Sequence, residues 1–97
     1  LVRFIRSEAG SALADVWVVD ANSTDRTVEL AMAAGAQVLR TTVASRAHQM
    51  NLGAQQSRGH VLYFVHADVQ LRHGFVTDID ESLRHGYVSG CYRYVFD

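Results

Sequence analysis

The fold is decided by one stretch of sequence, Asp15-Val16-Trp17-Val18-Val19-Asp20, together with the polar run behind it, Ala21-Asn22-Ser23-Thr24-Asp25. The first stretch is apolar and rich in β-branched residues between two carboxylates, and it shows no alternation of polar and apolar positions. A strand that is apolar on both faces suits a parallel sheet that helices cover on both sides. The polar run consists of residues favoured in turns and at helix N-caps. We therefore predict a buried strand over residues 15–20 that leads through a turn into a helix.

The rest of the chain continues the same alternation of helices and strands. Apolar residues at helical spacing predict helices, and short apolar runs predict strands. The predicted helices cover residues 1–13, 25–34, 46–57 and 75–83, and the predicted strands beyond the first cover residues 36–40, 61–65 and 87–96. The run V-L-Y-F-V at residues 61–65 is the strongest strand pattern of the chain. This order predicts an α/β fold of three layers, in which helices cross over between the mostly parallel strands of a Rossmann-like sheet.

Composition and charge exclude several classes of protein. The chain has 97 residues, of which 48% are hydrophobic, and its net charge is -1, so we expect a globular domain and no nucleic-acid partner. The single cysteine, Cys91, excludes an intramolecular disulfide and a cysteine-rich zinc module. No apolar run approaches the roughly 18 residues of a membrane span, and we expect a cytoplasmic protein. Because the sequence lacks an initial Met and ends inside a predicted strand, we expect residues 1–97 to form a single partial domain of a longer protein.

Two polar clusters follow apolar strands of the predicted sheet, at the end where ligands bind in folds of this class. Asp20 closes the first strand, and its carboxylate either faces a ligand or is a solvated strand end or a partner of the next helix. His66-Ala67-Asp68 follows the strand over residues 61–65, and extended chain points the imidazole and the carboxylate to one side. Such a pair either holds a divalent cation, with water and phosphate oxygens as further ligands, or is a polar cluster without a ligand.

A third candidate stands at the start of the helix predicted over residues 46–57. Arg46 lies where free backbone N–H groups and the helix dipole favour anions, and its guanidinium either binds one or is solvated in a loop. The histidines other than His66 show no zinc-ligand spacing and are interpreted as surface residues.

Three motifs, in order along the chain, resemble the family 2 glycosyltransferases of the GT-A fold. They are V-V-D-A-N-S-T-D-R-T at residues 18–27, R-A-H-Q-M-N-L-G at residues 46–53 and G-H-V-L-Y-F-V-H-A-D at residues 59–68. The family typically reads V-V-D-[DG]-G-S-T-D-x-T, then R-x-x-x-x-N-x-G, and then a strand that ends in [DH]-A-D. The H-A-D form, with G-C-Y-R-Y-V-F-D at residues 90–97, is similar to a bacterial subgroup. The resemblance covers residues from about 14 to 97 and implies a GT-A nucleotide-binding sheet that is incomplete.

The resemblance also implies which residues bind the donor, a nucleotide-diphosphate sugar. Asp20 matches the aspartate that hydrogen-bonds the nucleotide base, and Asn22 lies in the turn behind it. Arg46 matches a basic position near the nucleotide, and Ala67 lies between the two ends of the metal motif, where the donor binds. The sugar passes to an acceptor hydroxyl with inversion, and neither the sugar nor the acceptor is specified by these residues.

His66 and Asp68 match the two ends of the family's D-x-D metal motif, so the resemblance implies a divalent cation, Mg or Mn. Histidine replaces the first aspartate of that motif, which predicts weaker Mg binding and more tolerance of Mn. Ala21 replaces a second acidic residue of the nucleotide site, so a contact to the base or the ribose is expected to be lost.

The chain lacks two further parts of the family pattern. The first strand of the family would precede these residues, and the acidic residue that serves as catalytic base would follow them, so we assign no catalytic residue. A non-catalytic nucleotide-binding or self-associating module with the same fold is the alternative. A nucleotidyltransferase is less well supported, because the sequence has no Gly-rich phosphate loop. Pairing with a second copy and peripheral membrane association of a longer parent protein stay open at this stage.

Overall fold

The computed structural model describes residues 1–65, 71 and 73–91, and in this part of the chain the strands form a parallel pair. Strand β1 (Trp17–Asp20) lies beside strand β2 (Gln37–Arg40), with Trp17 opposite Gln37 and Asp20 opposite Arg40. Backbone hydrogen bonds extend the pairing at both ends, since Gln37 N donates to Val16 O at 2.9 Å and Thr41 N donates to Asp20 O at 2.9 Å. The carboxyl ends of the two strands therefore meet at one edge of the sheet.

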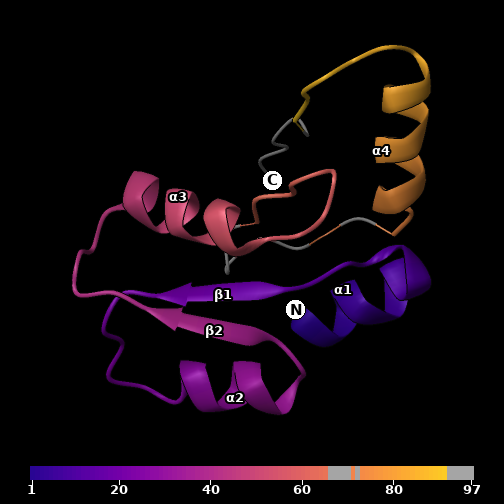
Figure 1. The fold of residues 1–97 in the computed structure, drawn as a ribbon. Coiled ribbons are helices and arrows are strands. Elements are labelled where there is room, and N and C mark those ends of the chain that lie inside the picture. The colour runs from indigo at the N-terminus through magenta and orange to yellow at the C-terminus, as the bar shows by residue number, and fades with distance from the viewer. Residues whose placement is uncertain (66–70, 72, 92–97) are drawn as a thin grey trace, which may run out of the picture.

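Helices cover both faces of this sheet, as the sequence predicts for an α/β fold. Helix α2 (Thr27–Ala33) lies on one face and helix α3 (Arg46–Gln56) on the other (Figure 1). Val19 points toward α3, because its Cγ2 lies 3.4 Å from the position that a Cβ on Gly53 would take. Since side chains alternate along a strand, Asp20 points to the α2 side. The predicted three-layer α/β architecture is confirmed, with an incomplete sheet.

Two further helices pack against each other at the other end of the molecule. Helix α1 (Val2–Ala9) leads into the short 3-10 helix η1 (Gly10–Ala12), and helix α4 (Phe75–Arg84) follows much later in the chain. The Glu8 carboxylate accepts a hydrogen bond from the backbone N–H of Gly74 and lies 3.4 Å from His73 Nδ1. Among the described residues, no helix is both long enough and apolar enough to cross a membrane.

The first helix is shorter than the sequence pattern predicts. The apolar spacing extends to Leu13, but the α-helix ends at Ala9, because Gly10 takes a positive φ of 52° with ψ of -127°. Glycine has no Cβ that would oppose this conformation, so the chain leaves the helix there at little cost.

The prediction of a strand over residues 61–65 is wrong. These residues are described and form no strand, although Tyr63 packs against Phe75 with the ring centroids 5.4 Å apart. A strand needs the backbone of a neighbouring strand, and residues 61–65 instead line a hollow of about 930 Å³ whose lining also includes residues 16–19. Residues 87–91 also form no strand, and the remainder of the strand predicted over residues 87–96 lies outside the described residues.

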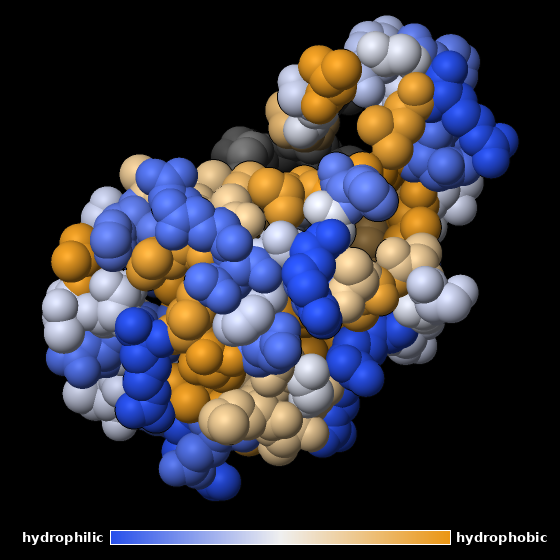
Figure 2. All heavy atoms as spheres, viewed as in Figure 1, coloured by the Kyte–Doolittle hydropathy of each residue, from blue (hydrophilic) through white to orange (hydrophobic). Residues whose placement is uncertain are grey.

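The hollow, which we call the apolar groove, is lined by residues 16–19 and 61–65 and by one side of α1, α3 and α4. Val61, Leu62 and Phe64 are 45–47% exposed along it. In the described part of the chain the buried apolar residues are Ala31, Ala36 and Phe75, so the core is small. Figure 2 shows the consequence, since hydrophobic residues reach the surface between hydrophilic ones.

Candidate functional site

Asp20 closes β1 as a buried carboxylate, with 6% of the residue exposed. Its Oδ2 accepts a hydrogen bond from the backbone N–H of Ser23 at 3.0 Å. The turn between them passes through Asn22, whose φ of 62° is left-handed, and asparagine is among the side chains that tolerate this conformation best. A buried carboxylate requires such a donor, so the turn and the carboxylate hold each other in place.

Asp25 serves the start of helix α2 instead of the pocket. Its carboxylate accepts hydrogen bonds from the hydroxyl of Thr27 and, at 3.0 Å, from the backbone N–H of Thr27. The hydroxyl first, and then the amide, lower the pKa of Asp25 below its ordinary value. The two aspartates thus have different roles, because Asp25 binds the first turn of α2 and Asp20 lies at the edge of the sheet.

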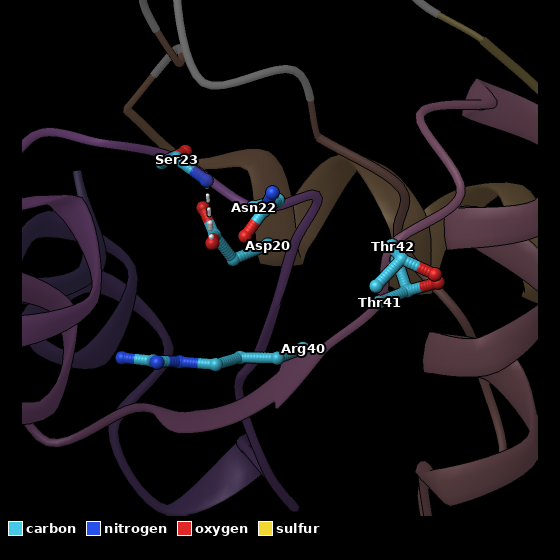
Figure 3. A pocket seen from close by; sticks show the side chains of 6 residues that line it. All are labelled: Asp20, Asn22, Ser23, Arg40, Thr41 and Thr42. Carbon is cyan, nitrogen blue, oxygen red and sulfur yellow. Dashed lines mark hydrogen bonds between the residues drawn. The ribbon is translucent and has the colours of Figure 1, made fainter.

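A shallow pocket of about 160 Å³ lies at the carboxyl ends of β1 and β2 (Figure 3). Its lining residues are all polar or charged: Asp20, Asn22, Ser23, Arg40, Thr41 and Thr42. Ligand sites usually enclose about 300–1,000 Å³, so this pocket can hold one part of a ligand, such as a single ring. We call it the strand-end pocket. It contains Asp20 and Asn22, which the sequence singles out.

Arg40 is a pocket residue that the sequence reading missed. It is the last residue of β2 and the register partner of Asp20, so its side chain starts on the same side of the sheet. Figure 3 shows the Arg40 side chain extending past the Asp20 carboxylate. The signal was present in the sequence, since Arg40 ends a predicted parallel strand and the ends of parallel strands share one edge.

Arg46 lies on the other side of the sheet from this pocket. It is the first residue of α3 and is exposed, and the preceding Ser45 accepts a hydrogen bond from His48 N at 3.4 Å. Gln49 fastens the same helix to β1 by donating to Val19 O at 3.0 Å. Arg46 lines the apolar groove, so the structure does not bring it into the strand-end pocket with Asp20 and Asn22.

The comparison with protein families agrees with this architecture. The family model described as glycosyl transferase family 2 matches residues 2–97. The chain belongs to this family. Membership indicates a glycosyltransferase that uses a nucleotide-sugar donor and an acceptor. Searches of the curated proteins and of the solved structures returned no significant match.

The metal motif expected of this glycosyltransferase falls outside the described part of the structure. His66, Ala67 and Asp68 are the residues concerned, so their prediction as metal and donor ligands remains a prediction. Among the residues that the structure does describe, no group of three or more His, Cys, Asp and Glu side chains could hold a metal ion.

Proposed function

We propose that this chain is the donor-binding part of a metal-dependent, inverting family 2 glycosyltransferase. The observation that carries the proposal is the placement of Asp20, a buried and oriented carboxylate at the carboxyl end of β1 in a chain that matches the family over residues 2–97. Ligands of open α/β sheets bind at this edge. The strand-end pocket has the polarity and the size to receive the nucleobase of the donor.

Each candidate residue has a distinct role in this proposal. Asp20 accepts a hydrogen bond from the nucleobase, and Asn22 shapes the turn that borders it. Arg46 provides a positive charge on the far side of β1 for the phosphates, and Ala67 borders the donor. His66 and Asp68 hold Mg or Mn, because carboxylate and imidazole are a donor set that suits these ions. A bound cation would neutralise the charge that develops on the departing diphosphate.

The reaction is a displacement at the anomeric carbon. The acceptor hydroxyl oxygen forms a bond to that carbon while the bond from the carbon to the donor phosphate breaks. The electron pair leaves with the nucleoside diphosphate, and the hydroxyl proton passes to a general base. Attack from the face opposite the leaving group inverts the anomeric centre. We assign no residue to the role of base. Asp80 on α4 is a surface carboxylate, since it pairs with Arg84 at 2.9 Å and is half exposed.

Calorimetric titration of UDP, with and without Mn, tests the donor site directly. Asp20→Asn replaces one carboxylate oxygen by an NH₂ group, which can only donate hydrogen bonds. Loss of a hydrogen bond to a charged group weakens binding by about 10- to 100-fold, so the affinity for UDP is expected to fall by this factor. Asp25→Asn is the matched control, because it changes a nearby carboxylate that binds Thr27 at the start of α2 and does not line the strand-end pocket. Asp68→Ala is expected to remove the effect of Mn, and Asp80→Asn is expected to leave it unchanged.

Two results would overturn the proposal. One is UDP affinity that is equal in wild type and Asp20→Asn, and the other is the absence of binding by any nucleoside diphosphate when circular dichroism shows a folded chain. UDP binding that ignores Mn would instead favour the non-catalytic nucleotide-binding module.

Self-association is a second candidate function, favoured by the open edge of β1 and the apolar groove. β1 has only β2 as a partner among the described residues, and Leu62 and Phe64 are 45% and 47% exposed beside that edge. We propose a second copy of this chain as the partner, because each copy carries both an open edge of β1 among its described residues and a run at residues 61–65 that has a strand-like sequence but forms no strand.

Sedimentation velocity over a concentration series tests this second candidate. A dimer that Leu62→Glu disperses supports it, and Leu30→Glu is the control, since Leu30 is 60% exposed on α2 and does not line the groove. A monomer at every concentration contradicts it.

A further inference from the structure

We infer that Arg40 is a second nucleobase-binding residue. Its guanidinium donates a hydrogen bond to a carbonyl of the base, and Asp20 accepts a hydrogen bond from the ring N–H next to that carbonyl. The inference rests on the proposed donor site and adds to it a specificity for bases with a ring N–H next to a carbonyl, as in uracil. It arises from the placement of opposite charges in the strand-end pocket.

The first observation is that Asp20 and Arg40 line one pocket without pairing with each other. They are register partners on neighbouring strands, which lie about 4.8 Å apart in a sheet, and both contribute to the pocket wall. No ion pair joins them within 4.0 Å, and the Asp20 carboxylate instead accepts a hydrogen bond from the Ser23 N–H at its Oδ2. An acceptor and a charged donor thus stand next to each other with a space that a ligand can bridge.

The second observation is that the guanidinium of Arg40 has no other partner in the described part of the chain. Arg26 binds Glu29 at 3.2 Å and Arg84 binds Asp80 at 2.9 Å, whereas no ion pair joins Arg40 to a described carboxylate. Arg40 is exposed at the pocket mouth and makes no hydrogen bond to any described residue. Its donors are therefore available to a ligand in the pocket.

The carboxylate of Asp20 and the guanidinium of Arg40 determine which hydrogen-bonding edge of a base fits between them. A carboxylate beside a guanidinium matches an edge that offers an N–H donor next to a carbonyl acceptor. Uracil and thymine carry this edge on one ring, and guanine carries it on two fused rings. Cytosine in the same position would turn a ring-nitrogen lone pair toward Asp20 and an amino group toward Arg40, so both contacts would be repulsive. The volume of about 160 Å³ favours the single-ring bases.

The test compares uridine, UDP, CDP and GDP in wild type, Arg40→Ala and Arg3→Ala. Arg3 is an exposed arginine of α1 outside both cavities, so its variant controls for the loss of one positive charge. Amide NMR titration reads the weak affinity of uridine, and calorimetry reads the diphosphates. Arg40→Ala is expected to weaken uridine and UDP by the same factor, about 10- to 100-fold, and to reduce the preference for UDP over CDP. Arg3→Ala is expected to match wild type.

The outcomes separate this inference from the proposed function. If Arg40→Ala weakens UDP but leaves uridine unchanged, Arg40 contacts phosphate and the inference is overturned. If Arg40→Ala binds all four ligands like wild type while Asp20→Asn does not, the inference fails and the donor site stands. If wild type binds GDP more tightly than UDP, the hydrogen bonds proposed for Asp20 and Arg40 still fit the base, but the inferred preference for single-ring bases is contradicted. Wild type that binds none of the four overturns the donor site and the inference together.

Discussion

Replacing Asp15 with alanine is expected to lower the free energy of unfolding by about 2 kcal/mol. The Asp15 side chain is 7% exposed, and its two oxygens accept hydrogen bonds from the Ser57 hydroxyl and from the backbone N–H of Arg58, both at 2.9 Å. These bonds fasten the end of α3 to the residues before β1. Hydrogen bonds to charged groups contribute about 1.5–3 kcal/mol each, so the two bonds give about 3–6 kcal/mol, and re-solvation of the exposed Arg58 N–H and of the Ser57 hydroxyl lowers the net loss to about 2 kcal/mol.

The same carboxylate predicts a pH dependence. Burial raises the pKa of Asp15, but the hydrogen bonds from the Arg58 backbone N–H and the Ser57 hydroxyl outweigh burial, so the pKa in the folded chain lies below its ordinary value. An acid whose folded-state pKa is lowered stabilises the fold above its unfolded pKa of about 3.9. That contribution is lost as the pH falls through the lower, folded-state pKa.

Urea unfolding followed by the fluorescence of Trp17, the only tryptophan, measures both effects. The matched control is Asp80→Ala, because Asp80 is an exposed carboxylate of α4 whose side chain is 55% accessible. The difference between wild type and Asp15→Ala is expected at pH 7 and should shrink as the pH falls below about 4. Equal urea midpoints at pH 7, or a difference that persists undiminished in acid, would refute the reasoning.

Two further predictions concern the joints between elements. Gly35→Ala is expected to destabilise the fold by about 1–2 kcal/mol, because φ is 98° there and the new Cβ would lie 3.1 Å from the Arg6 guanidinium. Gly90→Ala is the control, because Gly90 has open space around it. Equal thermal midpoints of wild type and Gly35→Ala would contradict this prediction. The hydrogen bond from the Gly74 N–H, and after it the contact with His73, lower the pKa of the Glu8 carboxyl. The hydrogen bond from Gly74 to Glu8, which joins α1 to the start of α4, is therefore fully present above the ordinary pKa of glutamate and is lost as the pH falls through the lowered pKa. The protection factor of the Gly74 amide, which is its hydrogen-exchange rate relative to that of an unstructured amide at the same pH, should fall over that acid range, and an unchanged protection factor would rule this out.

The elements that local sequence fixes were predicted well. The strand over residues 15–20 and the helix over residues 46–57 are present as β1 and α3 with ends displaced by two residues or fewer. Their signals lie within each segment, in apolar spacing and in a capping residue such as Ser45. The run at residues 61–65 carries an equally strong local pattern, but strand formation depends on a neighbouring backbone that the run does not itself provide.

In the candidate site, too, features set by one segment were predicted and features set by two segments together were not. Asp20 was predicted because it directly follows an apolar strand, and the hydrogen bond from Ser23 explains why this polar turn encloses it. Arg40 was missed because its place in the pocket depends on the register between β1 and β2, a property of two segments together. Arg46 lies across the sheet from Asp20, and only the direction in which α3 packs against β1 determines that separation.

The backbone amide of Ser23 offers the most direct measurement of the central claim, since its hydrogen bond to Asp20 would feel any ligand held by that carboxylate. In an NMR titration of the nitrogen-15-labelled chain with UDP, the account predicts that the amide resonances of Asn22 and Ser23 shift first and furthest. Shifts confined to residues of the apolar groove, such as Gln49 and Gly53, with Ser23 unmoved at saturation, would contradict it.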